Sequence, residues 1–246
     1  MMSIDYQLFT DVGTRSINED SIRAAEKNGT YCFILCDGLG GHGKGEVASA
    51  FVADCIKQLF LGSSDIDSFI GTAFRTAQEE LLKEQKRLNA TTEMKTTCTV
   101  LLVDTNSNTY RYGHIGDSRI YTFRRNKLLT RTLDHSVPQM LVLAGDIKEK
   151  KIRNHPDRNR LLRVMGVEWD SPRFELSEVN ELQERDSFLM CSDGFWELIV
   201  ERQMCKTLKR SASAKEWMEK MNGIVSKNGK GKDMDNNSAI AVICNK

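Results

Sequence analysis

The sequence lacks the features that mark nucleic-acid-binding and membrane proteins. Its 35 Lys and Arg residues face 34 Asp and Glu residues, which leaves a formal net charge of only +1. Such a chain has no overall field that would attract nucleic acid or an anionic membrane, so any recognition of anions must be local. The N-terminus has no basic and then apolar signal segment, and no apolar run approaches the roughly 20 residues that span a bilayer. We therefore expect no nucleic-acid partner and no membrane partner.

The cysteines form none of the arrangements that carry chemistry. The seven cysteines include no CxxC pair, and none begins the C-x5-R loop of thiolate phosphotransfer. Their odd number argues against a disulfide framework. Several lie in apolar runs such as YCFILC, where cysteine behaves as a small buried hydrophobe in a reducing compartment. These features predict a cytoplasmic location.

The length and the hydrophobic pattern predict one domain that spans residues 1–246. Two helical patterns, at 46–62 and at about 66–88, follow one another without a strand between them. From residue 96 the pattern changes to short β-branched and aromatic runs that are separated by Asn, Gly and Asp turns. The strands expected after this point lie at 96–104, 108–116, 118–126, 186–193 and 238–245. We predict an α+β fold, a four-layer α/β/β/α sandwich of two antiparallel sheets that are flanked by helices.

A charged insert interrupts this pattern between the meander and the later strands. Residues 135–166 contain apolar stretches on both sides of a charged middle, and we expect them to be mostly helical and to form an exposed lobe.

A glycine-rich loop, CDGLGGHGKGE at 36–46, joins an apolar strand at 31–36 to the first helix and has three interpretations. Gly38, Gly40 and Gly43 spell the GxGxxG of a dinucleotide site, but that site needs a parallel strand after the first helix, where a second helix is expected. A phosphate-binding P-loop fails at Gly45, where its hydroxyl residue should stand. The third interpretation makes Asp37, at the strand end, a metal ligand.

Asp37 belongs to a set of acidic residues at strand ends. The others are Asp117 in HIGDS, Asp193 in MCSDG, Asp235 in MDNNS, and the pair Glu19 and Asp20 in INED. Any single case is better explained as a surface turn. Several carboxylates that meet in one cleft would repel one another unless cations neutralise them, and oxygen ligands select Mg²⁺ or Mn²⁺. A pair of such ions about 3.5–4 Å apart suits the hydrolysis of phosphate esters.

Arg15, in GTRSINED, is placed to bind the oxygens of a phosphate with its guanidinium group. An ion pair with an acid of its own turn explains the same residue equally well.

At this point the chain resembles the metal-dependent protein serine/threonine phosphatases of type 2C, the PPM family, in their short bacterial form. The motifs that carry the resemblance cover nearly the whole chain in order: GTRSINED, CDGLGGHGKGEVAS, HIGDSRIY, LDHSVPQMLVLAGDI, NHPDRNRLLRVMG, LMCSDGFWE and DNNSAIAV. Ordered motifs of this number are far more specific than a glycine pattern alone.

The resemblance implies the site residues. The implied metal-binding set is Asp37, Gly38 through its carbonyl oxygen, Asp193, Asp235, Asp117 and Asp20. Asp37 would bridge two Mn²⁺ or Mg²⁺ ions, and Asp117 would join Asp193 at a third, weaker ion. Asp20 and Glu19 would orient water around the metals. Arg15, Asp37 and Asp193 would be the catalytic residues, with Arg15 on the substrate phosphate.

One departure from the family concerns acid catalysis. Animal members have a histidine directly after Asp-Gly, where this chain has Leu39. His42 comes later in the loop, and we expect it to support the loop rather than to donate a proton.

The resemblance implies a cytoplasmic phosphatase that hydrolyses phosphoserine and phosphothreonine by direct attack of a metal-activated water. Phosphorylated proteins would be its substrates, a serine/threonine kinase its counterpart, and the flap at about 136–166 would influence substrate access; we expect a monomer. Two alternatives stay open. One is a switch phosphatase dedicated to one regulatory phosphoprotein, and the other is an inactive module that binds phosphoproteins.

Overall fold

The apolar runs at 31–36, 96–104, 186–193 and 238–245 each contain a strand of one of two antiparallel sheets. The computed structural model describes residues 2–40 and 43–245. Sheet A contains, in spatial order, β1 (Ser3–Asp11), β11 (Asn237–Asn245), β10 (Asp186–Cys191), β6 (Arg119–Arg124) and β7 (Lys127–Arg131). Sheet B contains β2 (Asp20–Lys27), β3 (Thr30–Asp37), β4 (Cys98–Asp104), β5 (Thr109–Ile115) and the short β8 (Glu175–Leu176), and β9 (Asn180–Glu181) also pairs with β5.

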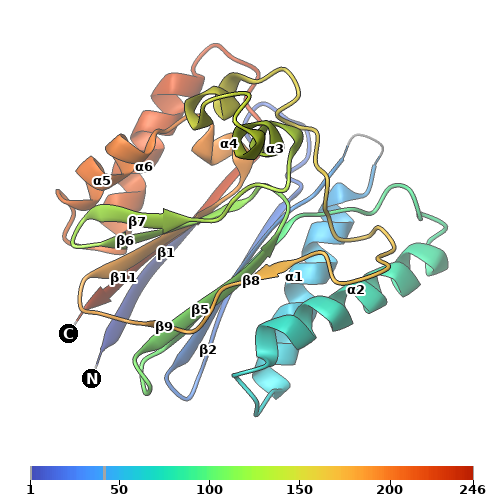
Figure 1. Cartoon of the computed structure of the whole chain (residues 1–246), viewed down its shortest axis with the longest axis horizontal. Helices are drawn as coiled ribbons and strands as arrows, with labels where there is room; N and C mark the ends of the chain where they lie inside the picture. The colour runs from blue at the N-terminus through green and yellow to red at the C-terminus, as the bar shows by residue number, and fades with distance from the viewer. Residues whose placement is uncertain (1, 41–42, 246) are drawn as a thin grey trace.

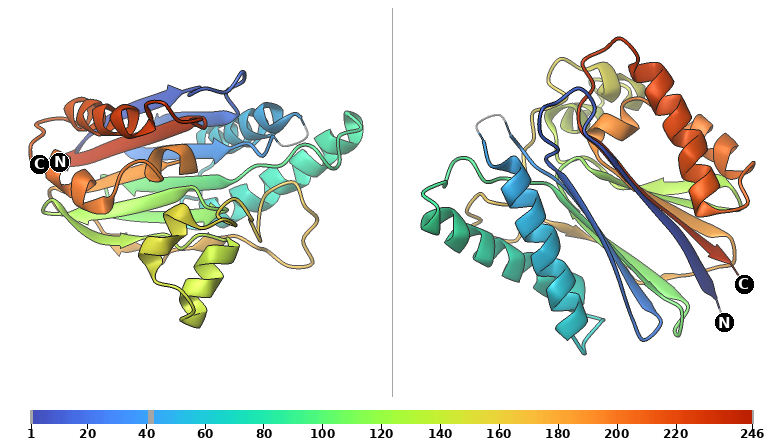
Figure 2. Two further views of the ribbon diagram at one scale, coloured as in Figure 1. Left: turned by 90° about the horizontal axis from the view of Figure 1, so that it is seen from above. Right: turned by 180° about the vertical axis from the view of Figure 1, so that it is seen from behind.

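Helices cover the outer face of each sheet (Figure 1). The helices are α1 (Gly45–Gly62), α2 (Phe69–Arg87), α3 (Val137–Ala144), α4 (Asp193–Trp196), α5 (Glu201–Leu208) and α6 (Ala214–Gly229), with one 3-10 turn, η1 (Glu149–Asn154). The pair α1 and α2 lies against sheet B, and α5 and α6 lie against sheet A, so that the two sheets face each other in the middle (Figure 2). The predicted α+β sandwich of two antiparallel sheets is confirmed.

The central strands β3, β4, β10 and β11 are almost wholly buried, because both of their faces are covered. Along β3, Cys32 and Ile34 pack against α1 and α2, while Phe33 and Leu35 point into the layer between the sheets. This alternation follows from the two-residue period of a strand, and it explains why YCFILC has no polar position.

The connection after β3 decides between the interpretations of the glycine loop. The chain passes through α1 and α2 and returns as β4, which pairs with β3 in antiparallel orientation. A dinucleotide-binding unit requires a parallel strand at this point. The architecture therefore excludes both nucleotide interpretations.

Two parts of the chain differ from the predictions. The insert at 135–166 is helical only at α3 and η1, so the expectation of a mostly helical segment is wrong. The elements that went unpredicted are β2, β7, β8, β9, α4, α5 and α6. Helix α6 begins with a capping pair in which the Ser213 hydroxyl accepts the Glu216 N–H at 3.2 Å.

The seven cysteines are all free, and most of them are buried. Within residues 2–40 and 43–245, none of the helices combines the length and the apolar character that crossing a bilayer demands.

Candidate metal centre

Sheet B supplies Asp37 and Asp20 from neighbouring strands. The two residues are directly paired in the antiparallel register of β2 and β3. The backbone of Asp37 is fixed on its other side, since its N–H donates to the Thr97 hydroxyl at 3.0 Å and its carbonyl accepts the Thr97 N–H at 2.8 Å. The strand end is therefore a rigid platform for both carboxyl groups.

Sheet A supplies Asp193 and Asp235 from the ends of β10 and β11. Asp193 is the first residue of α4, two positions after β10, and Asp235 lies two positions before β11. Gly194 lets these segments approach each other, because a Cβ atom at this position would overlap the carbonyl oxygen of Asn236. Ser192 connects this group to sheet B by donating its hydroxyl hydrogen to Asp20 Oδ2 at 2.8 Å.

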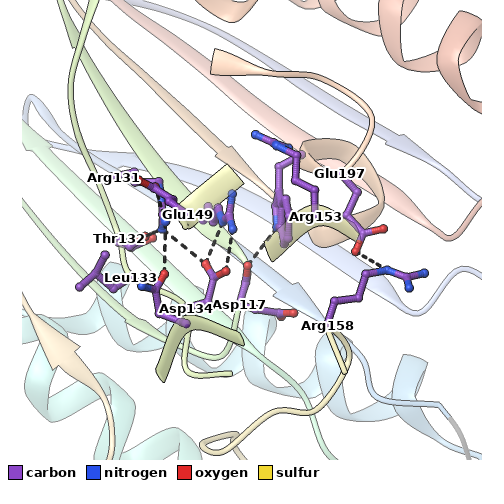
Figure 3. Close-up of polar contacts among 12 residues, drawn as sticks. Asp117, Arg131, Thr132, Leu133, Asp134, Glu149, Arg153, Arg158 and Glu197 are labelled. Atoms are coloured by element: carbon purple, nitrogen blue, oxygen red, sulfur yellow. Dashed lines mark hydrogen bonds and ion pairs between the residues drawn. The ribbon is translucent and has the colours of Figure 1, made fainter. Parts of the chain in front are cut away.

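Asp117 completes the set from the turn that leads from β5 of sheet B to β6 of sheet A. Its carbonyl oxygen accepts the indole N–H of Trp196 at 3.0 Å, which ties the turn to α4 (Figure 3). This turn joins the two sheets, and it brings Asp117 close to α4, which begins at Asp193.

The predicted site residues meet at one cleft of about 760 Å³. Those that line it are Arg15, Glu19, Asp37, Gly38, Asp117, Asp193 and Asp235. Asp20 lies buried beneath it beside Asp37. His42 falls outside the described residues.

Burial, and after it the charges of neighbouring acids, raises the pKa of the carboxyl groups in the cleft. Burial is the first cause at Asp37, whose pKa lies well above its usual range, and the charges of Asp20 and Asp193 add to the effect. Burial likewise raises the pKa of Asp193, with Asp117 as the next cause. The pKa of Asp20 rises to about 6 and that of Asp117 to about 7, in both cases mainly through burial. Carboxylates this close are costly to ionise without a counter-charge.

These residues fit hard divalent cations. The donors are all oxygen atoms, which Mn²⁺ and Mg²⁺ prefer. One of them, Asp20 Oδ1, is buried without a hydrogen-bond partner among the described residues. Cations in the cleft would satisfy this atom and offset the mutual repulsion that raises the pKa values.

The glycines of the loop after β3 make room for Glu19. A side chain at Gly40 would overlap the Glu19 carboxylate, and one at Gly45 would crowd it. The backbone N–H of Glu19 donates to the Asn236 side-chain oxygen at 2.8 Å, so the residue is held from both sheets. The Glu19 carboxylate packs against Gly45. This contact explains why a glycine stands at the position where a P-loop has its hydroxyl residue.

Arg15 reaches the metal cleft, but its partner is not the one expected. Its guanidinium donates to Asp235 Oδ2 at 2.9 Å, whereas the sequence suggested either a phosphate or an acid of the same turn. The side chain remains 48% exposed, so it can still meet a ligand that enters the cleft.

A buried polar network behind the cleft was missed by sequence reasoning. Arg119 forms a two-pronged ion pair with Asp134, at 2.8 and 2.6 Å, and its guanidinium lies 3.5 Å from the centre of the Trp196 ring. Figure 3 also shows Glu197, which directly follows α4, paired with Arg158 of the insert at 2.8 Å. Burial raises the pKa of Glu197. The position of Glu197 in DGFWE was the only signal that could have indicated it.

Comparisons with known proteins agree with this geometry. A profile described as protein phosphatase 2C matches residues 12–237. The serine/threonine phosphatase stp of Listeria welshimeri is 30% identical over 216 residues, which cover 84% of each chain. The crystal structure of the phosphatase Stp1 from Staphylococcus aureus superposes with a TM-score of 0.88 at 27% identity, over 98% of this chain and 95% of that one. The catalytic domain of the phosphatase PstP, solved with two manganese ions, gives a TM-score of 0.83 at 25% identity over the full length of both chains.

Proposed function

Because the chain belongs to the protein phosphatase 2C family and is a metal-dependent serine/threonine phosphatase, we propose that the cleft between the strand ends is its catalytic centre. The observation that carries this proposal is the convergence of Asp37, Asp193 and Asp235, which come from both sheets and line one cleft. A set of isolated surface turns would have scattered these side chains.

We assign the carboxylates to a pair of Mn²⁺ or Mg²⁺ ions. Asp37 would bridge the pair, the Gly38 carbonyl oxygen would bind one ion, and Asp193 and Asp235 would bind the other. Asp117 would contribute to a third site together with Asp193, and Asp20 and Glu19 would support the ligands from behind. When bound, the cations supply Lewis acidity and make a nucleophile available from water at neutral pH.

Arg15 binds the phosphate of the substrate in this account. Its side chain is 48% exposed, so the guanidinium N–H groups can turn toward the phosphoryl oxygens of a substrate in the cleft. Leu39 lines the same cleft and has no proton to donate, so the chain has no acid at that position for the leaving alkoxide.

The direct test is the hydrolysis of p-nitrophenyl phosphate and of a phosphothreonine peptide with Mn²⁺. We expect activity with Mn²⁺, loss of activity with a chelator, and loss in Asp193→Ala at equal Mn²⁺. Equal rates in all three samples would refute the catalytic assignment. Rates that depend on the metal but survive Asp193→Ala would place the centre elsewhere.

We further propose a single domain over residues 1–246 that acts as a cytoplasmic monomer and opposes a serine/threonine kinase. The seven free cysteines support a reducing location. A phosphatase dedicated to one regulatory phosphoprotein has the same catalytic residues, so it differs only in its target. The complete acidic set disfavours an inactive binding module, because such a module has no need of six converging carboxyl groups.

A further inference from the structure

The wall of the metal cleft has a different charge from its floor. The acids of the floor are Asp37, Asp117, Asp193 and Asp235, together with Asp20, which is paired with Asp37. Above them, the wall presents four cations: Lys95, Arg160, Arg163 and Arg173. Three of these come from the segment between β7 and β8, and Lys95 comes from the stretch before β4. The lining of the cleft therefore combines a group of acids with a group of cations, although the net charge of the chain is only +1.

Two of the wall cations have no ion-pair partner among the described residues. Lys95 is half-buried, and its backbone carbonyl accepts the Leu39 N–H at 2.9 Å, so it adjoins the Asp37–Gly38 strand end. Arg173 is exposed and lines the same cleft. The other two are paired only with exposed or half-exposed acids, Arg163 with Glu175 at 3.1 Å and Arg160 with Asp157 at 3.3 Å.

The wall cations are not needed to neutralise the floor. A pair of divalent cations would offset most of the floor's negative charge. The unpaired cations remain in excess and face the solvent from which a substrate arrives. Such a field attracts anionic groups beyond the phosphate itself.

The same wall carries apolar side chains that suit a polypeptide. Leu162 and Val167 are exposed, and Trp169 is half-buried beside them. A free phosphate or a small phosphorylated metabolite would leave these side chains in water. A peptide segment can cover them while its charged residues reach the cations.

We propose that this wall, through Lys95 and Arg173, selects phosphoserine and phosphothreonine sites that are flanked by acidic residues. The proposal rests on the proposed function, since it describes which phosphoproteins that centre accepts. Lys95 would pair with an acidic residue close to the phosphorylated one, and Arg173 with one farther along the peptide. Each pair is worth about twofold to fivefold in kcat/KM, as expected for a solvent-exposed ion pair.

The test compares two phosphothreonine peptides that differ only in charge. In one, Asp and Glu flank the phosphothreonine on both sides; in the other, Asn and Gln replace them. Mn²⁺ is held in large excess, so that the acidic peptide does not deplete it, and p-nitrophenyl phosphate is measured in parallel. We expect kcat/KM to favour the acidic peptide by about tenfold at low salt and by less at high salt, because salt screens exposed charges.

Lys95→Gln and Arg173→Gln identify the residues responsible. Each should lower the ratio of the two kcat/KM values by about twofold to fivefold, and the double variant should bring the ratio close to one. A change in the chemical step alters both kcat/KM values by the same factor, so it does not change their ratio. Arg173 is exposed, so its variant keeps the fold even if Lys95→Gln does not. Lys209→Gln, which removes an exposed charge at the end of α5, is the matched control and should leave the ratio unchanged.

Two results would overturn the selectivity: equal kcat/KM for the two peptides in the wild-type protein, or a preference that survives the double substitution. In either case, continued hydrolysis of p-nitrophenyl phosphate would still support the catalytic assignment. Loss of hydrolysis of all three substrates in saturating Mn²⁺ would instead overturn the proposed function, and the selectivity with it.

Discussion

The floor of the cleft and its wall are built in different ways. On the floor, Asp20 and Asp37 sit in a strand ladder, and Asp193 and Asp235 adjoin strands that pair with each other. Most of the wall instead comes from the segment between β7 and β8, whose only described helices are α3 and η1 and which is held by ion pairs such as Arg158 to Glu197. Backbone ladders fix positions far more firmly than exposed ion pairs do. The metal-binding acids therefore lie where the fold fixes positions most firmly. The cations that we assign to substrate selection lie where substitutions cost little stability.

The largest effect should come from a change on the floor. We expect Asp37→Asn to lower kcat by about a thousandfold, equivalent to about 4 kcal/mol, because it removes the ligand assigned to both cations. Steady-state kinetics in saturating Mn²⁺ measure this loss. A variant that keeps a tenth of wild-type activity would show that Asp37 is not the bridging residue.

Breaking the buried Arg119–Asp134 pair behind the floor should have an effect of similar size, in this case on the free energy of unfolding. Arg119→Met leaves the buried carboxylate of Asp134 with only its longer ion pair to Arg131 at 3.7 Å, and we expect the free energy of unfolding to fall by about 3–5 kcal/mol. Urea denaturation measures the change. The matched control is Arg23→Met, which breaks the more exposed pair with Asp54 and should cost less than about 1 kcal/mol. Equal losses in the two variants would contradict this contrast.

In the metal-free protein, stability should fall as the pH rises from about 6 to about 7.5. The folded-state pKa of Asp117 is raised to about 7, so the folded chain holds a proton that the unfolded chain has already released, and the stability this provides is lost on passing the folded pKa. Asp117 alone accounts for on the order of 1 kcal/mol over this interval. Urea denaturation in chelator measures the trend, and Asp117→Asn should weaken it. A midpoint that rises with pH would contradict the account.

The smallest effect should come from the contact between the insert and α4. Arg158→Gln removes the pair with Glu197, in which both side chains are partly exposed, and should lower the free energy of unfolding by less than about 1 kcal/mol. A loss above about 2 kcal/mol in thermal or urea unfolding would mean that the wall is as firmly built as the floor.

The sequence was informative where local pattern and final structure coincide. Apolar runs that end in Asp-Gly or Asp-Ser indicated both the strands and the acids, because a strand covered on both faces must be apolar up to the turn at which it leaves the sheet. Asp37 and Asp193 could therefore be named before their positions were known.

The remaining features depend on contacts between distant parts of the chain. The partner of Arg15 is 220 residues away, and no local pattern indicates that pairing. The apolar stretch of α3 suggested a longer helix, but the non-helical part of the insert is held by ion pairs to other elements, such as Arg158 to Glu197 at 2.8 Å. Helix propensity does not decide the conformation of such a segment.

The binding of Mn²⁺ to the purified, metal-free chain tests the central claim most directly. Isothermal titration calorimetry should show two ions per wild-type chain, as in the related manganese-bound phosphatase domain, and loss of that tight binding in Asp37→Asn. A wild-type chain that binds less than one ion, or an Asp37→Asn variant that binds two ions as tightly as the wild type, would contradict the claim that these strand ends hold a pair of cations.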